Sequence, residues 1–399
     1  MNVADRLAPA FRCNYQKASI AADPVAAAEP LIHFESADPF YPDQGIPACV
    51  RQAIMEKLDD QSAAHYPPLT GDSGLKKTLA KRLNEKYHAN VDPERNILVI
   101  PGAELGLVAA LTAFLQQGDE LLIPDPSYAS YFQAAQLLGA KVVSVPLRQE
   151  RDFAGGVSDF TDRMTSKTKA AILAQPNNPT GTLFSSEFLS EFCTCVVEKD
   201  LLLLCDMVFD DLVYDQQPCT WPALCPGMWE RTVSLFSVSK GQALTGLRVG
   251  FMVASEELIQ AIVNTFLPVN CSVSLLMQSA AKAILDNKTL YESYRQKLQA
   301  RRDKTCAALA KVPGISFPIP AGGTQFWIDV SKLGSAAEVA AYLRQKGIFV
   351  GAGDSMGPIN GAGHIRMVFA CINDEIAYEN ALERFCRALR EHPNQPVSE

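Results

Sequence analysis

Short apolar runs alternate with amphipathic segments through the first three quarters of the chain. The runs have the length of buried strands, and they fall at 97–100, 120–123, 141–145, 169–173, 201–205, 233–237 and 249–253. Between most of them apolar residues recur at helical spacing, and before the first run Leu75, Leu79 and Leu83 mark one face of an amphipathic helix. This alternation predicts an α/β fold whose large domain has a mostly parallel seven-stranded sheet sandwiched by helices.

The pattern changes from about residue 290 onward. A long charged segment with helical spacing is followed by three short runs, QFWIDV, IFV and HIRMVFA, with helical segments among them. We therefore expect a smaller α+β domain at residues 289–399 beside a large domain at residues 49–288. The Pro- and Ala-rich residues 1–48 are predicted to form an N-terminal arm and part of the smaller domain.

Composition and charge argue against several classes of function. The net charge is −8, so the electrostatic field of the molecule disfavours nucleic acids and anionic membranes. No stretch approaches the roughly 20 apolar residues that span a bilayer, and the first residues lack the apolar core of a signal peptide. Eleven cysteines, several in apolar contexts, suit reduced thiols in a cytoplasmic protein. Cys193 and Cys195 form a C-x-C pair without a nearby histidine, so no metal site is expected.

Residues that could bind a ligand follow the predicted strands. In mostly parallel sheets a ligand lies beyond the carboxyl ends of the strands, so the residues after each run are the informative ones. The first run is followed by PGAELG, where free amides at a helix start could bind phosphate, although a plain turn has the same composition. Tyr128 in PDPSYASY could cover a flat ring or belong to the core. Asn178 in QPNNPTG could bind a ligand or only shape a turn.

The two following strand ends carry the strongest chemistry. One run is followed directly by Asp206, and an ionised carboxylate is costly at the edge of an apolar strand unless a partner compensates it. The next run leads into SVSKGQALTGLRVG, which contains Ser237, Ser239, Lys240 and Arg248. Together the strand ends supply a lysine, a cationic and amide-lined anion site, an acid and an aromatic ring. An aldehyde cofactor with a phosphate and a basic ring nitrogen needs these four groups at once.

In their order along the chain, these motifs resemble those of the fold-type-I pyridoxal-phosphate enzymes, specifically the class I/II aminotransferase superfamily. The motifs are HYPPLTGDSGLKK, PGAE, PDPSY, QPNNPTG, DMVF, SVSK with LRVG, and HIRMVF, and they cover nearly the whole chain. Asn178 lies 28 residues before Asp206, which lies 34 residues before Lys240. The resemblance implies an aspartate-aminotransferase-like fold, pyridoxal 5′-phosphate (PLP) as cofactor, and a cytoplasmic homodimer with shared active sites.

The resemblance also implies a role for each matching residue. Lys240 would form the Schiff base and then move the α-proton, and Asp206 would pair with the protonated ring nitrogen. Arg366 in HIRMVF would bind the α-carboxylate of the substrate as a bidentate pair. The other implied cofactor contacts are Tyr128 over the ring, Asn178 at the 3-oxygen, Tyr66 of the neighbouring subunit at the phosphate, and Ser237, Ser239, Arg248 and the amides of Ala103 and Glu104 around the phosphate.

Several positions depart from that family pattern. Phe209 stands where most of these enzymes have a tyrosine that donates to the 3-oxygen, so the imine nitrogen is expected to hold its proton more tightly. Ala37 replaces a glycine whose amide meets the substrate carboxylate, and Glu104 puts a carboxylate beside the phosphate site. Glu35 and Asp38 lie on the segment that passes the substrate side chain. If one faced the site a cationic substrate would be favoured, whereas both being solvated is equally compatible with the sequence.

The sequence therefore predicts a PLP-dependent aminotransferase that exchanges an L-α-amino acid with an α-keto acid. Phe209, Ala37 and Glu104 keep open a PLP-dependent lyase, cyclase or oxygen-consuming oxidase or hydroxylase of a cationic, arginine-like amino acid. A ligand-sensing domain of a DNA-binding regulator is a third possibility. Only about 45 residues precede the first domain elements and they are not basic, which disfavours that possibility.

Overall fold

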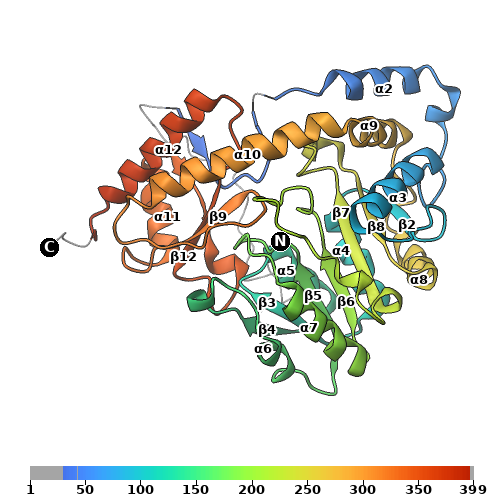
Figure 1. The fold of residues 1–399 in the computed structure, drawn as a ribbon, viewed down its shortest axis with the longest axis horizontal. Helices are drawn as coiled ribbons and strands as arrows, with labels where there is room; N and C mark the ends of the chain where they lie inside the picture. Colours follow the sequence, from blue (N-terminus) through green and yellow to red (C-terminus); the bar gives the residue numbers. More distant parts are fainter. Residues whose placement is uncertain (1–29, 43, 396–399) are drawn as a thin grey trace, which may run out of the picture.

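The computed structural model describes residues 30–42 and 44–395 (Figure 1). Its central sheet contains β2 Ile97–Ile100, β3 Glu120–Asp125, β4 Lys141–Pro146, β5 Thr168–Ala174, β6 Leu202–Asp206, β7 Thr232–Ser237 and β8 Gly250–Val253. The strands lie in the order β2-β8-β7-β6-β5-β3-β4. β8 runs antiparallel to both neighbours and every other pair is parallel. The predicted seven strands and the mostly parallel sheet are thus confirmed.

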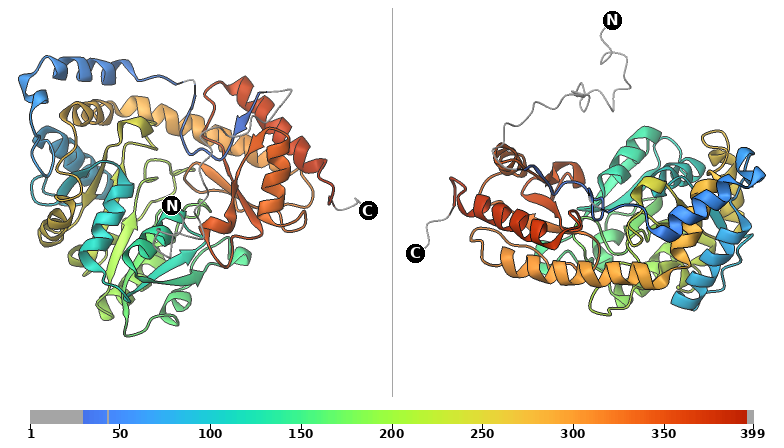
Figure 2. Two further views of the ribbon diagram at one scale, coloured as in Figure 1. Left: turned by 180° about the vertical axis from the view of Figure 1, so that it is seen from behind. Right: turned by 90° about the horizontal axis from the view of Figure 1, so that it is seen from above.

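Helices cover both faces of this sheet (Figure 2). They are α3 Ser73–Tyr87, α4 Ala103–Phe114, α5 Ala129–Leu138, α6 Val157–Thr161, α7 Ser186–Glu198, α8 Glu256–Phe266 and α9 Leu275–Leu285. A further helix, α2 Ala48–Leu58, packs on α9 at the outer edge of the molecule. Successive side chains of a strand point to opposite faces, so in β6 Leu203 and Cys205 join the core under α3, α6, α7 and α9, whereas Leu204 joins the core under α4, α5 and α8. Since both faces are buried, polar groups collect at the carboxyl edge of the sheet.

The smaller domain is built on a three-stranded antiparallel sheet in the order β11-β12-β9. Its elements are β1 Ile32–His33, α10 Lys288–Leu309, β9 Gln325–Asp329, α11 Ala336–Gln345, β10 Ile348–Phe349, β11 Gly351–Ala352, β12 His364–Val368 and α12 Glu375–Arg390. α10 runs from the large domain along the smaller one (Figure 1). The predicted boundary at residue 289 falls in the first turn of α10, and most of the predicted arm, residues 1–29, lies outside the described residues.

Short 3-10 helices complete the described chain. They are η2 Gln61–Ala64, η3 Gln149–Arg151, η4 Pro222–Leu224, η5 Trp229–Arg231, η6 Thr245–Leu247 and η7 Gly353–Met356. Within the described residues, no helix has the length and apolar character needed to cross a membrane. The large domain is therefore a sheet packed between helices, with polar groups at the carboxyl edge of the sheet.

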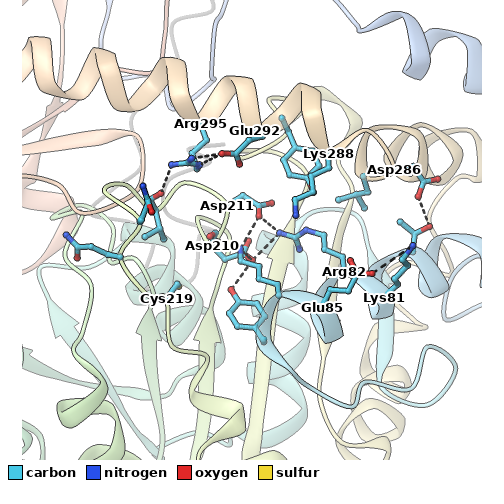
Figure 3. Close-up of a pocket in the computed structure, with 18 residues that line it drawn as sticks. Lys81, Arg82, Glu85, Asp210, Asp211, Cys219, Asp286, Lys288, Glu292 and Arg295 are labelled. Carbon is cyan, nitrogen blue, oxygen red and sulfur yellow. Dashed lines mark hydrogen bonds and ion pairs between the residues drawn. The ribbon is translucent and has the colours of Figure 1, made fainter.

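A cluster of charges whose two carboxylates are mostly buried joins α3 to the segment that follows β6 (Figure 3). Lys86 Nζ lies 2.7 Å from Asp210 Oδ2 and 3.0 Å from Asp211 Oδ1, and Arg82 pairs with both carboxylates. Gln242 Nε2 donates to Asp211 Oδ2 at 2.6 Å, so the cluster also holds the turn after β7. Although burial opposes it, the charges of Arg82 and Lys86 keep the pKa of Asp211 below its usual range. The cluster lines a cavity of about 620 Å³.

Replacing Asp211 with Asn is expected to lower the free energy of unfolding by about 3 kcal/mol at neutral pH, because Arg82 and Lys86 lose a buried counter-charge. Urea unfolding followed by circular dichroism measures the change. Asp286→Asn is the matched control, since Asp286 pairs with Lys282 at the surface and exposed pairs contribute at most about 1 kcal/mol. Equal losses in the two variants would contradict a stabilising role for the buried cluster.

Candidate active site

A cavity of about 360 Å³ opens at the carboxyl edge of the central sheet, within the size range of small-molecule sites. Its lining comes from both domains and consists of Ala37, Ala103, Glu104, Leu107, Tyr128, Tyr131, Asn178, Asp206, Val208, Phe209, Leu235, Ser237, Ser239, Lys240, Thr245, Arg248 and Arg366. All the predicted site residues are among them except Tyr66 and Glu35. The larger cavity of Figure 3 is lined by charges that are mostly paired with one another, so the smaller cavity is the candidate active site.

Asp206 ends β6 and presents its carboxylate to the cavity. Tyr131 Oη donates to Asp206 Oδ2 at 2.5 Å, and the Val208 amide donates to Asp206 Oδ1 at 2.9 Å. The second bond closes a tight turn of a kind that Asp favours. Burial raises the pKa of Asp206, and the two donors act against that rise because they bind the ionised form. A positive charge placed against this carboxylate would compensate its burial.

Lys240 lies three residues after β7 and faces the same cavity. Its Nζ donates to the carbonyl oxygen of Ala37 at 2.5 Å. Burial and the positive charges of Arg366 and Arg248 lower the pKa of Lys240 to about 8, while Asp38 opposes the shift. An amine with this pKa is partly neutral near physiological pH and can attack an aldehyde carbon.

A group of anion-binding donors lies where α4 begins. The hydroxyls of Ser237 and Ser239 are 2.8 Å apart, and the Ser239 amide donates to Ser237 Oγ at 3.0 Å. The first amides of α4, beginning at Ala103, have no intrahelical partner. Gly102 precedes them with φ of +88°, and a Cβ there would lie 2.6 Å from Arg248 Nη2. Glycine therefore allows the guanidinium to lie against the helix start, which suits a phosphate.

Arg366 reaches the cavity from β12 of the smaller domain. Its Nη1 donates to Asn178 Oδ1 at 3.4 Å and its Nη2 to the carbonyl oxygen of Glu35 at 3.3 Å. The Nε of Arg366 is buried and has no hydrogen-bond partner among the described residues. Burial lowers the pKa of Arg366. The guanidinium therefore retains a free donor and forms no ion pair within the described residues, so a ligand carboxylate could bind it.

Tyr128 and Glu104 form the wall between α5 and α4. Tyr128 is the N-cap residue of α5, and burial followed by the nearby Glu104 carboxylate raises the pKa of its hydroxyl. Glu104 was expected to bring its charge beside the phosphate site, and the structure places that charge close to the Tyr128 phenol. The carboxylate forms no ion pair within the described part of the chain.

Three of the predicted residues, Phe209, Glu35 and Tyr66, bring no polar group to the cavity of this chain. Phe209 lines the cavity, and its ring is 6% exposed because it packs in the core of the smaller domain. Glu35 lies outside the cavity lining, where Oε1 meets His33 Nδ1 at 2.9 Å. Tyr66 is 88% exposed and does not reach the cavity of its own chain. The roles predicted for these residues stay predictions.

Tyr131 and Thr245 line the cavity but were not singled out from the sequence. Thr245 Oγ1 donates to Asp38 Oδ1 at 2.6 Å. Tyr131 follows Tyr128 by three residues in SYASY, a spacing that puts two helical side chains on one face. That spacing is the signal that could have identified Tyr131 as a cavity residue.

The cavity residues fit PLP, the cofactor that the motif resemblance implies. Lys240 offers a partly neutral amine, and Asp206 offers a carboxylate whose burial calls for a positive partner. The serine hydroxyls, Arg248 and the free amides of α4 offer a phosphate site. The donor of Arg366 that lacks a partner remains for a substrate carboxylate. Each group that the cofactor requires is therefore present on the wall of one cavity.

Proteins of similar sequence and structure are known. The family model described as aminotransferase class I and II matches residues 29–385. An aspartate aminotransferase of Pyrococcus abyssi is 31% identical over 88% of this chain and 90% of its own length. An arginine–pyruvate transaminase of Pseudomonas aeruginosa is 32% identical over 82% of this chain and 83% of its own length. The crystal structure of an aromatic aminotransferase from Pyrococcus horikoshii matches with a TM-score of 0.84 and 30% identity, covering 93% of this chain and 98% of that chain.

Competitive acetylation of the cofactor-free protein, read out by mass spectrometry, is expected to give Lys240 a pKa of about 8. Its reactivity should fall as the pH drops through that value, because the amine becomes protonated. Arg366→Gln is expected to raise the pKa, since it removes a neighbouring positive charge. Arg390→Gln on α12, which removes an equal charge outside the cavity, is the control. Reactivity of Lys240 that keeps rising to pH 10 would contradict the lowered pKa.

Proposed function

Because the chain belongs to the class I and II aminotransferase family, it is a PLP-dependent enzyme that transfers amino groups between amino acids and keto acids, and we propose that the cavity around Lys240 is its active site. The observation that carries this proposal is the meeting of a lysine of lowered pKa, an acid held by two donors and an arginine with an unpartnered donor in one cavity. The lysine is suited to exchange with the substrate amine, the acid to pair with the cofactor ring nitrogen, and the arginine to bind the substrate carboxylate.

When bound, PLP supplies an electron sink for the negative charge left as a bond to the substrate Cα breaks. Lys240 Nζ would hold the aldehyde carbon of the cofactor and, as a free amine, would be placed to accept the proton from the substrate Cα as a general base. Asp206 would hold the positive charge of the ring nitrogen. Ser237, Ser239 and Arg248 would hold the phosphate through hydroxyl and guanidinium donors.

Arg366 orients the substrate through its α-carboxylate. The Nε without a partner and one Nη could bind a planar carboxylate in the fork geometry that arginine favours, which would fix Cα relative to Lys240. Arg366 also lowers the pKa of Lys240. A bound carboxylate offsets that positive charge, so substrate binding raises the basicity of the amine that must take the α-proton.

We further propose that a cationic amino acid is the preferred amino donor. Glu104 lines the cavity beside Tyr128, is exposed and forms no ion pair within the described residues, so its carboxylate is accessible to a guanidinium or ammonium of the substrate. Among the relatives, one is named an arginine–pyruvate transaminase. Glu104 thus takes the place of Glu35, whose carboxylate meets His33, as the acid argued to select a cationic side chain.

L-Arginine added to the holoenzyme is expected to convert the absorbance of bound PLP to that of its amine form, and pyruvate should reverse the change. Lys240→Ala is expected to abolish both conversions. Glu104→Gln is expected to lower kcat/KM for L-arginine about tenfold, or about 1.4 kcal/mol, and to leave the value for L-alanine nearly unchanged. Oxygen consumption with L-arginine, without formation of the amine form, would instead support the oxidase alternative that Phe209 leaves open.

We propose that the working unit is a homodimer with shared active sites. Tyr66 is 88% exposed, and Met55 and Leu58 on α2 and Val269 in the segment between α8 and α9 are exposed by more than half. Exposed apolar residues of this kind mark association surfaces. Tyr66 of one subunit would then reach the phosphate in the other. A cytoplasmic location remains the expectation from the reduced cysteines.

Mixing Lys240→Ala subunits with Tyr66→Phe subunits is expected to restore activity above the mean of the two separate preparations. A hybrid dimer would contain one site with both substitutions and one site with neither. Subunits are exchanged by mild denaturation and refolding, and steady-state activity is measured at limiting PLP. Two preparations of the same variant, mixed in the same way, serve as the control. Activity equal to the mean would contradict the contribution of Tyr66 across the interface.

A further inference from the structure

Tyr131 makes the one side-chain hydrogen bond that Asp206 receives within the described residues. Its Oη lies 2.5 Å from Asp206 Oδ2, while the backbone amide of Val208 holds the other oxygen. Tyr131 is 1% exposed, and its ring meets that of Tyr128 edge to face with centroids 5.6 Å apart. Packing therefore leaves the hydroxyl little freedom to leave the carboxylate.

We propose that Tyr131 is a positioning residue that keeps Asp206 ionised and directed at the ring nitrogen of the cofactor. The inference rests on the proposed pairing of Asp206 with that nitrogen. An O–H donor bound to a carboxylate is a charge-assisted hydrogen bond, stronger than one between neutral groups. It favours the ionised form, and only the ionised form holds a protonated ring nitrogen by charge.

The charges around Asp206 show why this donor matters. Burial and the Glu104 carboxylate on α4 raise the pKa of Asp206, whereas the Tyr131 hydroxyl on α5, the Val208 amide and Lys240 after β7 lower it. Of the three groups that lower the pKa of Asp206, the Tyr131 hydroxyl has the largest effect. Without it, Asp206 would take up a proton at higher pH and would then be a neutral partner.

The position of Phe209 strengthens the same argument. Its side chain carries no hydroxyl, so among the described residues that line the cavity the phenol groups are those of Tyr128 and Tyr131, both at the α5 wall. Of these two, Tyr131 directs its hydroxyl to the acid proposed to bind the ring nitrogen.

The test compares PLP with its 1-deaza analogue, in which C–H replaces the ring nitrogen. Each is titrated into cofactor-free protein, and the dissociation constants are measured by protein fluorescence. Tyr131→Phe is expected to weaken PLP binding about tenfold and to leave binding of the deaza analogue unchanged, because the analogue has no nitrogen for Asp206 to hold. Tyr378→Phe removes an equally buried hydroxyl, bonded to Thr305 at 2.6 Å in the smaller domain, and is the matched control.

Raising the pH should restore PLP binding by Tyr131→Phe, because Asp206 ionises again above its raised pKa. Equal weakening for PLP and for the analogue would overturn the inference, since a purely structural role affects both. A wild-type protein that binds the two compounds equally well would refute the proposed Asp206–nitrogen pair itself. If the wild type discriminates and Tyr131→Phe discriminates to the same extent, only the role of Tyr131 fails.

Discussion

The structure depends on the cost of holding charges at the edge of a sheet that is buried on both faces. β6 ends in Asp206 between two apolar cores, and Lys240 follows the neighbouring strand β7. Neither group is hydrated as it would be at the surface, so burial moves both pKa values toward the neutral forms. The hydroxyl of Tyr131 and the carbonyl of Ala37 are the local partners that make this arrangement tolerable. These partners do not fully compensate the charges of Asp206 and Lys240. A ligand that carries complementary charges would therefore bind there favourably.

The segments that follow β6 and β7 contribute to two groups of polar side chains. In one group the charges are paired with one another, and in the other they are not. Asp210 and Asp211 follow Asp206 by one turn and are paired with Arg82 and Lys86 (Figure 3). Gln242 links this cluster to the turn after Lys240. The paired cluster fixes the backbone at both strand ends. The incompletely paired groups of the neighbouring cavity are thereby held in place without satisfying one another, which is the condition for a preorganised site.

The local pattern of apolar residues was enough to predict the strands. Contacts between residues that are distant in the sequence could not be predicted from that pattern. Strands buried on both faces are continuous apolar runs, and the partly buried edge strand β4 also contains such a run, so all seven could be located from the sequence. The order of motifs predicted which residues would meet in the cavity. It did not indicate Tyr131, whose partner lies 75 residues away, or the Arg82–Asp211 pair, separated by 129 residues. Glu35 was considered for the cavity because of its segment, yet a histidine two residues away meets its carboxylate.

Phe209 shows how a missing hydroxyl can be a packing choice. Its ring belongs to the same apolar cluster as Phe40 and Leu212, which is the core of the smaller domain, while one side of it faces the cavity. A phenol in its place would put a hydroxyl at that boundary, and its hydrogen-bond partner would have to come from a ligand in the cavity. Arg366 also comes from the smaller domain. The cavity wall is thus complete only where the two domains meet, so contacts between the domains set the shape of the site as directly as the strand ends do.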